Sequence, residues 1–220
     1  MAQASSATKC GFDRDDHRVE RLGLLADVFA ADTSAFEREV NALRTHQGQS
    51  DVFVINSGGT ILAPTFGGGA NSLVTQLLDD AAIISSDFGG NPPYAKMKEV
   101  ATICYRHWLA QTNVLFIVGR KSNNTDIFET FRAMGDALRE YFGAKAPTPL
   151  YVVAARGGPN LVRGMGALAD VCDGLGIPYH QFSFDSATSE VVLYARAVDR
   201  WMRDGSRAAL AARMGIREAT

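Results

Sequence analysis

Apolar residues recur every three or four positions along several stretches of the chain, which is the spacing of one face of an α-helix. This spacing predicts helices over residues 18–29, 35–43, 94–111, 125–142, 160–176 and 187–202. A continuous apolar run, typical of a strand that is covered on both faces, lies at residues 113–119, and further strands are predicted at residues 150–156 and 178–184. Strands that alternate with helices predict parallel pairing through right-handed crossovers. From about residue 81 the expected fold is therefore α/β, a flavodoxin-like, doubly wound parallel sheet.

The residues before position 81 follow a different pattern. Residues 51–66 read as two short strands around a turn at Ser57-Gly58-Gly59, which predicts a hairpin. A cluster of three glycines at 67–69 then opens a short helix. We expect two segments: residues 1–80, with N-terminal helices and this hairpin, and residues 81–220, with the parallel sheet.

Composition narrows the class of protein. The chain has 220 residues, 46% of them hydrophobic, and a net charge of −2 without a basic stripe, which argues against a nucleic-acid partner. No apolar run reaches the roughly 18 residues of a membrane span, and the first 20 residues lack the apolar core of a signal peptide. The three cysteines (Cys10, Cys104 and Cys172) are too widely spaced for a disulfide framework or a zinc site. These features predict a cytoplasmic protein.

Candidate chemistry lies where strands end, because open α/β sheets bind ligands outside the carboxyl ends of their strands. The strand over 113–119 leads into "GRKSNNTD", in which Arg120 and Lys121 supply cations. Asn123, Thr125 and their neighbours are helix-capping types, so the next helix is expected to begin there. The unpaired N–H groups and the dipole of a helix N-terminus favour an anion.

A second strand ends in "ARGGPN", and "DFGGNPP" opens a further helix. Arg156 offers a planar fork suited to a carboxylate, although an arginine at a strand end is most often exposed or salt-bridged. Gly89 and Gly90 would let the backbone approach a ligand closely. Together these strand ends predict a pocket for a small polyanion with planar acid groups. Neither a phosphate-binding P-loop nor a dinucleotide fingerprint is present in the sequence.

Three segments carry a resemblance to a known family. "FIVGRKSNNTDIFETFRAM", "ARGGPNLVRGM" and "LGIPYHQF" resemble the citrate-binding domain of ATP-citrate lyase and of citryl-CoA synthetase. "GGTILAPTFGGGANSLVTQLLDD" and "DFGGNPPYAKMKEV" are more distantly similar to the C-terminal part of the succinyl-CoA synthetase β subunit. The resemblance implies a flavodoxin-like acid-binding domain, preceded at about residues 51–80 by a short remnant of an ATP-grasp domain.

The resemblance also implies substrate-binding residues, and it assigns no catalytic or metal-binding residue to this chain. The family's citrate contacts fall on Gly90, Asn123, Thr125, Tyr141 and Arg156. Tyr141 follows Thr125 by about 16 residues, roughly 24 Å along a straight helix, so either the helix breaks or Tyr141 serves the core. Arg120 stands where citrate-binding relatives carry a serine, and it would either shrink the pocket or add a carboxylate contact.

Proteins of this family join an acid to coenzyme A with ATP. The favoured hypothesis is that this chain binds a citrate-like di- or tricarboxylate as part of such a ligase, working with separately encoded ATP-grasp and CoA-binding subunits. ATP, Mg²⁺ and coenzyme A are then implied for the full assembly, none of them held by this chain alone. Partner ligase subunits, a homo-oligomer or both are expected. The alternatives are a stand-alone carboxylate-binding or regulatory module and an unrelated flavodoxin-like enzyme.

Overall fold

The structure is a computed structural model that describes residues 33–144 and 148–206. Its helices are α4 (Ala35–Ala42), α5 (Gly68–Leu78), α6 (Tyr94–Trp108), α7 (Ile127–Ala144), α8 (Leu161–Leu175) and α9 (Thr188–Trp201). Its strands are β1 (Asp51–Val54), β2 (Ile61–Leu62), β3 (Thr65–Phe66), β4 (Ile84–Asp87), β5 (Val114–Lys121), β6 (Tyr151–Gly157) and β7 (Tyr179–Phe182). The helix predicted over residues 18–29 lies outside the described residues.

The predicted parallel α/β sheet is confirmed. Both β2 and β3 pair in parallel with β5, β5 pairs with β6, and β6 pairs with β7. Strand β4 lies beside β2 and β3, because Ile83 N donates to Ile61 O at 3.0 Å and Phe88 N donates to Thr65 O at 2.9 Å. The order β4–β2–β5–β6–β7 is that of a flavodoxin-like sheet.

The hairpin predicted over residues 51–66 is wrong. Strand β1 pairs antiparallel with β4, in the register Val52↔Ser86, and β4 itself was not predicted from its sequence Ile-Ser-Ser-Asp. The segment between β1 and β2 bonds to residues 81–83 instead of folding β1 back onto β2. Thr60 N donates to Ala81 O at 3.1 Å, and a Cβ at Gly59 would collide with the same carbonyl group. The glycine turn therefore serves a close backbone approach to another segment.

The segment before residue 80 contributes to the same sheet as the segment after it. Strands β2 and β3 are hydrogen-bonded to β5, and α5 packs against α9. The proposed division into residues 1–80 and 81–220, and the origin of the first segment in an ATP-grasp domain, stay predictions.

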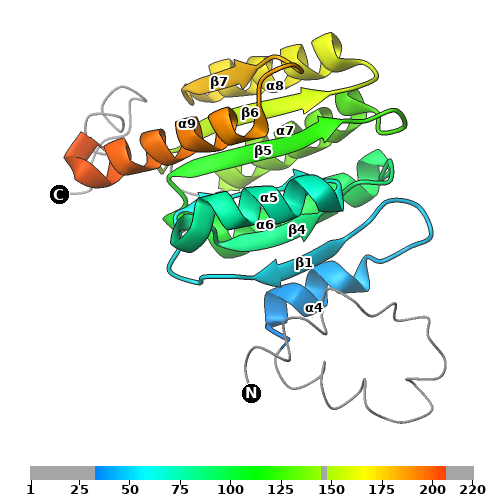
Figure 1. Ribbon diagram of the computed structural model, residues 1–220. Coiled ribbons are helices and arrows are strands. Elements are labelled where there is room, and N and C mark those ends of the chain that lie inside the picture. The colour runs from blue at the N-terminus through cyan, green and yellow to red at the C-terminus, as the bar shows by residue number, and fades with distance from the viewer. Residues whose placement is uncertain (1–32, 145–147, 207–220) are drawn as a thin grey trace.

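Two layers of helices cover the sheet (Figure 1). Helices α6, α7 and α8 pack side by side on one face, and α5 and α9 cover the other. Each face has its own apolar cluster, represented by Leu115, Ile117 and Ala154 on the first and by Phe116, Val118 and Ala155 on the second. No helix in the described part of the chain is long and apolar enough to cross a membrane. The carboxyl ends of β3, β5 and β6 meet at one edge of the sheet, where the cavities described next are found.

Candidate functional site

A cavity of about 320 Å³ lies at this edge, and we call it the central cavity. Its volume is at the lower end of the roughly 300–1,000 Å³ that is usual for small-molecule sites. Segments far apart in the sequence converge on it, because parallel strands bring their carboxyl ends together. Its lining consists of Gln49, Phe66, Gly67, Gly68, Gly69, Ala70, Asp87, Gly89, Gly90, Arg120, Lys121, Ser122, Asn124, Thr125 and Arg156.

Arg156 is a buried cation near the end of β6. Its side chain is only 2% exposed, and Nε, Nη1 and Nη2 have no hydrogen-bond partner among the described residues. The guanidinium lies over the ring of Phe66, with Cζ 4.2 Å from the ring centroid. Nη1 lies so close to Gly119 that a Cβ there would collide with it. An arginine at a strand end is usually exposed or salt-bridged, and Arg156 is neither.

Burial changes the acidity of Arg156. Loss of water around the guanidinium lowers its pKa from its usual range to about 10, and the nearby negative charge of Asp87 acts in the opposite direction. The pKa still lies well above 7, so Arg156 carries its charge at neutral pH. A charged guanidinium without an acceptor is costly to bury. Arg156 is therefore a charged donor that has no acceptor among the described residues.

Asp87, at the end of β4, is already occupied by donors of the protein. Its Oδ1 accepts hydrogen bonds from Gly67 N at 2.7 Å and from Gly89 N at 2.9 Å. With the Gln49 amide nitrogen turned toward it, Oδ2 accepts a further bond at 3.0 Å. Asp87 therefore ties the glycine segment before α5 to the loop after β4. Sequence reasoning missed it because β4 was not recognised.

Helix α5 begins at the central cavity without a side-chain cap. Gly67 precedes it with φ 103°, a conformation that favours glycine, and its N-cap position makes no side-chain capping bond. The glycines at 67, 68 and 69 all line the cavity, and a Cβ at Gly69 would meet nothing within 4 Å. The first N–H groups of a helix have no intrahelical partner, and its dipole favours a negative charge. The first turn of α5 is therefore open to an anion.

Helix α7 begins close to the predicted position, but its N-terminus is already satisfied. Asp126 Oδ1 accepts from Glu129 N at 3.2 Å, and Asp126 N donates to Asn91 Oδ1 at 3.1 Å. Ile127 N donates to the carbonyl oxygen of Pro159 at 3.1 Å. Much of the anion affinity expected of α7 is therefore taken up by the protein itself. Thr125, just before the helix, is buried and still lines the cavity.

The structure brings together four of the six predicted substrate-binding residues. Gly90, Arg120, Thr125 and Arg156 line the central cavity, where Arg120 is exposed at the rim. Their role in binding a substrate stays a prediction. Three lining residues that sequence reasoning did not select are Phe66, Gln49 and Asp87. The run of three glycines at the start of α5 was noticed as a helix start and was not connected with a ligand.

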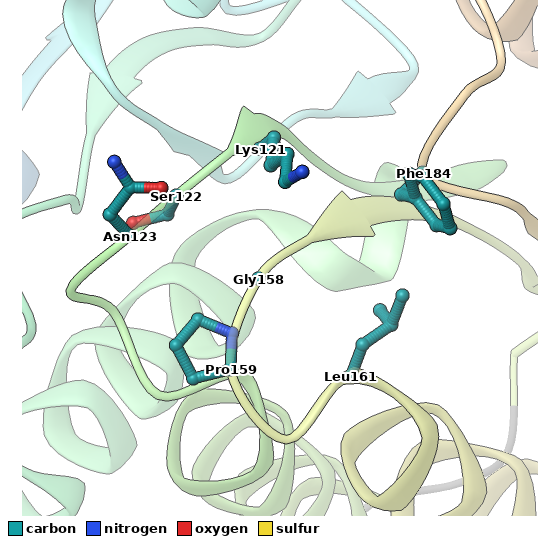
Figure 2. Close-up of a pocket in the computed structure, with 7 residues that line it drawn as sticks. All are labelled: Lys121, Ser122, Asn123, Gly158, Pro159, Leu161 and Phe184. Carbon is teal, nitrogen blue, oxygen red and sulfur yellow. The ribbon is translucent and has the colours of Figure 1, made fainter.

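The other two predicted residues lie elsewhere. Asn123 lines a neighbouring cavity between the loop after β5 and the start of α8, where Figure 2 shows it with Lys121, Pro159 and Phe184. Tyr141 is 8% exposed in the apolar cluster under α7, and its pKa is raised because burial disfavours the phenolate. Since α7 runs unbroken from Ile127 to Ala144, Tyr141 stands about 21 Å along the helix from its start. The structure thus places Tyr141 in the core and not in the central cavity.

The described residues do not fit a metal ion. No group of three or more histidine, cysteine, aspartate or glutamate side chains gathers among them in a way that could hold one. The cysteines that the structure describes, Cys104 and Cys172, are buried and free, and burial raises the pKa of each thiol to about 12. The chemistry of the central cavity is therefore that of fixed charge and hydrogen-bond donors.

Comparison with known proteins finds similar proteins that are much longer than this chain. ATP-citrate synthase from Mus musculus is 25% identical over 148 residues, which is 63% of this chain and 14% of that protein. ATP-citrate synthase alpha chain protein 2 from Arabidopsis thaliana is 25% identical over 134 residues, covering 57% of this chain and 32% of that one. The chain thus spans a third or less of these relatives.

A solved structure and a family model agree with these relatives. The structure of ATP citrate lyase from Methanothrix soehngenii in complex with citrate and coenzyme A matches with a TM-score of 0.68 and 21% identity. It covers 75% of this chain and 46% of that one, and at this identity it supports the fold. The family model for the citrate-binding domain of ATP citrate lyase matches residues 31–198. The chain belongs to the ATP citrate lyase citrate-binding family.

Proposed function

We propose that the central cavity binds a citrate-like di- or tricarboxylate, and that this chain is the acid-binding part of an ATP-dependent acid–CoA ligase. The observation that carries the proposal is Arg156, a charged guanidinium that is 2% exposed and has no hydrogen-bond partner among the described residues. A carboxylate matches the planar fork of an arginine with two parallel hydrogen bonds.

Different groups around the central cavity would bind different parts of the acid. Arg156 would hold one carboxylate, and the open first turn of α5 would donate backbone N–H groups to another. Thr125, which also lines the cavity, would offer its hydroxyl. Arg120 and Lys121 are exposed at the rim, where their charge would attract a polyanion from solution. Asp87 does not compete for Arg156, because its carboxylate already accepts from backbone N–H groups.

The proposal gives this chain the binding and orientation of the acid. A solved neighbour contains citrate and coenzyme A, and another contains citryl-CoA, in chains about twice as long as the matched region. We therefore assign ATP, Mg²⁺ and coenzyme A to partner subunits or domains of the ligase other than this acid-binding region. When such subunits are added, acid-dependent ATP hydrolysis and formation of a thioester are expected. An acid that binds while no ligase activity appears would favour a stand-alone binding or regulatory module.

Thermal unfolding tests the binding step. Citrate, malate, succinate and tartrate are added to the full chain, and an acid at 100 times its Kd should stabilise the fold by about 2.7 kcal/mol. The stabilisation should disappear in Arg156→Met and persist in Arg163→Met, which removes an exposed arginine from α8. Stabilisation that survives in Arg156→Met, or an absence of stabilisation by every acid, would contradict the proposal.

A further inference from the structure

Asp87 lines the central cavity although its charge opposes a bound anion. It is 9% exposed, and it is the one acidic side chain in the described lining of this cavity. Two carboxylates that share a site repel each other, so the charge of Asp87 weakens the binding of an acid. The contribution of Asp87 to the cavity must therefore come from the groups that its two oxygens hold in place.

One oxygen of Asp87 holds two glycine segments together. Oδ1 accepts from Gly67 N at 2.7 Å, just before α5, and from Gly89 N at 2.9 Å, in the loop after β4. The two segments lie so close together that a Cβ at Gly89 would come within 3.0 Å of this oxygen and 3.2 Å of Gly67 N. The small size of Gly89 therefore allows both segments to reach the same acceptor.

A third segment, the loop before β1, meets the other oxygen of Asp87. With its amide nitrogen turned toward Asp87, Gln49 donates to Oδ2 at 3.0 Å, and Gln49 N donates to Gly89 O at 2.8 Å. A Cβ at Gly90 would lie 3.5 Å from Gly48 Cα, so the two loops are in direct contact. Asp87 is thus the point at which three segments of the cavity wall join.

These segments carry the backbone groups to which the proposed function gives a role. Gly67 and Gly90 both line the cavity, and their φ values of 103° and 73° lie in the region that favours glycine. Glycine segments have the most conformational freedom to lose, so they need fixed bonds to hold one geometry. Donors that are already in position bind an anion more tightly than donors that binding must order. The bonds of Asp87 supply this order.

We infer that Asp87 is the positioning residue of the central cavity, whose carboxylate fixes the first turn of α5 relative to the loop after β4 without contacting the acid. The inference rests on the proposed function, because it concerns how the same cavity binds its acid. The cavity then requires oxygen acceptors at this position and does not require the negative charge. This requirement distinguishes a positioning role from a direct contact with the acid.

Asp87→Asn separates position from charge. Asparagine keeps an oxygen that can accept from Gly67 N and Gly89 N, and its amide nitrogen can donate to the Gln49 oxygen. The Kd values for citrate, malate, succinate and tartrate are measured by calorimetry on the full chain. Asp87→Asn should bind the acid as tightly as the wild type or up to about tenfold more tightly, because the repelling charge is gone. Asp87→Ala should bind it about tenfold or more weakly, because the segments are no longer held together.

A buried aspartate elsewhere in the fold is the matched control. Asp199 is 1% exposed, accepts from Asn113 Nδ2 at 2.9 Å and does not line the central cavity. Asp199→Ala should lower the Tm, as Asp87→Ala does, and keep the Kd within about threefold of the wild type. Asp87→Glu gives a second test should Asp87→Ala not fold, because it keeps the charge and displaces the oxygens by one methylene group. It should weaken binding while Asp87→Asn does not.

The backbone reports on the same role without a ligand. The carboxylate bonds to Gly67 and Gly89, so the N–H groups of Gly69 and Gly90, which follow on the same segments, report on order and not on a lost bond. Their NMR order parameters should fall in Asp87→Ala. They should stay at the wild-type values in Asp87→Asn and in Asp199→Ala.

Equal affinity of Asp87→Ala and the wild type would overturn the inference and leave the proposed function standing. A loss of affinity in Asp87→Asn as large as that in Asp87→Ala would overturn it as well, because the carboxylate would then contact the acid. Should no acid bind to the wild type, the proposed function fails and the order parameters decide. Lower values at Gly69 and Gly90 in Asp87→Ala would then uphold the positioning role, and unchanged values would overturn it.

Discussion

Two helices begin beside the central cavity, and their first turns are built in different ways. Helix α7 follows a run of capping residues, and Asp126, Asn91 and the carbonyl oxygen of Pro159 occupy its leading N–H groups. Helix α5 begins within a run of three glycines and has no side-chain cap. A helix terminus that the protein has capped contributes to stability. A terminus left bare beside a buried, unpartnered arginine is available to a ligand.

The largest effect is expected from removing the cation. Without ligand, Arg156→Met should raise the free energy of unfolding by roughly 1–2 kcal/mol, because the desolvation cost of the charge outweighs its contact with Phe66. Urea unfolding at pH 7 measures this. The exposed Arg163, which lies over the ring of Phe128, is the matched control, and Arg163→Met should lower the free energy of unfolding by less than about 1 kcal/mol. A marked loss of stability in Arg156→Met would mean that the guanidinium is a structural element.

The capped helix should show the opposite behaviour. Asp126→Ala removes the cap of α7 and its bond to Asn160, so it should lower the free energy of unfolding by about 1–2 kcal/mol. The Kd for the acid, measured by calorimetry, should change by less than about threefold, which corresponds to less than about 1 kcal/mol of binding free energy. A loss of affinity much greater than this would show that the terminus of α7, and not that of α5, holds the anion.

The pH dependence of stability gives a second test of Arg156. Its folded pKa is lowered from the usual range of an arginine to about 10, so below pH 10 the unfolded state holds this proton more tightly and the charge destabilises the fold. As pH rises above 10, the folded state loses the proton first and stability is regained. The stability advantage of Arg156→Met over the wild type should therefore shrink by about 1 kcal/mol between pH 8 and pH 11. A constant difference across this range would contradict the lowered pKa.

The smallest effect concerns the bare helix. Gly69→Ala places a methyl group where nothing lies within 4 Å, so the fold should be unchanged or stabilised by up to about 1 kcal/mol through higher helix propensity. The methyl group would project into the space that a ligand uses to approach the backbone, and the acid should bind several-fold more weakly. Ala95→Gly at an exposed position of α6 is a control that changes propensity alone. Unchanged affinity in Gly69→Ala would remove α5 from the binding site.

The sequence predicts the long elements of this fold well, for a physical reason. The buried strands β5 and β6 are continuous apolar runs, and α6 to α9 carry apolar residues at helical spacing, so each is legible locally. Strand β4 is not legible in this way. Two of its four residues are serines. Ser86 is buried, and its hydroxyl group is hydrogen-bonded to the backbone of Thr65 and Ala63, about 20 residues earlier in the chain. The error about the hairpin has the same origin, because the partner of β1 is β4.

The candidate site shows the same division. Arg156, Thr125 and Gly90 are recognisable because they stand at strand ends, where an open sheet binds ligands. Gly119 and Asp87 are not recognisable in the sequence. Gly119 is required because a Cβ there would collide with Arg156, and the carboxylate of Asp87 accepts hydrogen bonds from the backbone N–H groups of Gly67 and Gly89. Tyr141 lies in the core because α7 continues without a break from Ile127 to Ala144, and the sequence alone did not decide whether this helix breaks.

The central claim is that the charged guanidinium of Arg156 donates hydrogen bonds to the carboxylate of a bound acid. The most direct measurement is the NMR signal of the Arg156 Nε–H group in the wild-type protein, assigned by its absence in Arg156→Met. On addition of citrate, or whichever acid stabilises the fold, this proton should shift downfield and exchange more slowly with water. The change in chemical shift should follow a binding curve with the Kd found by calorimetry. An acid that binds while the Arg156 signal stays unchanged would contradict the account.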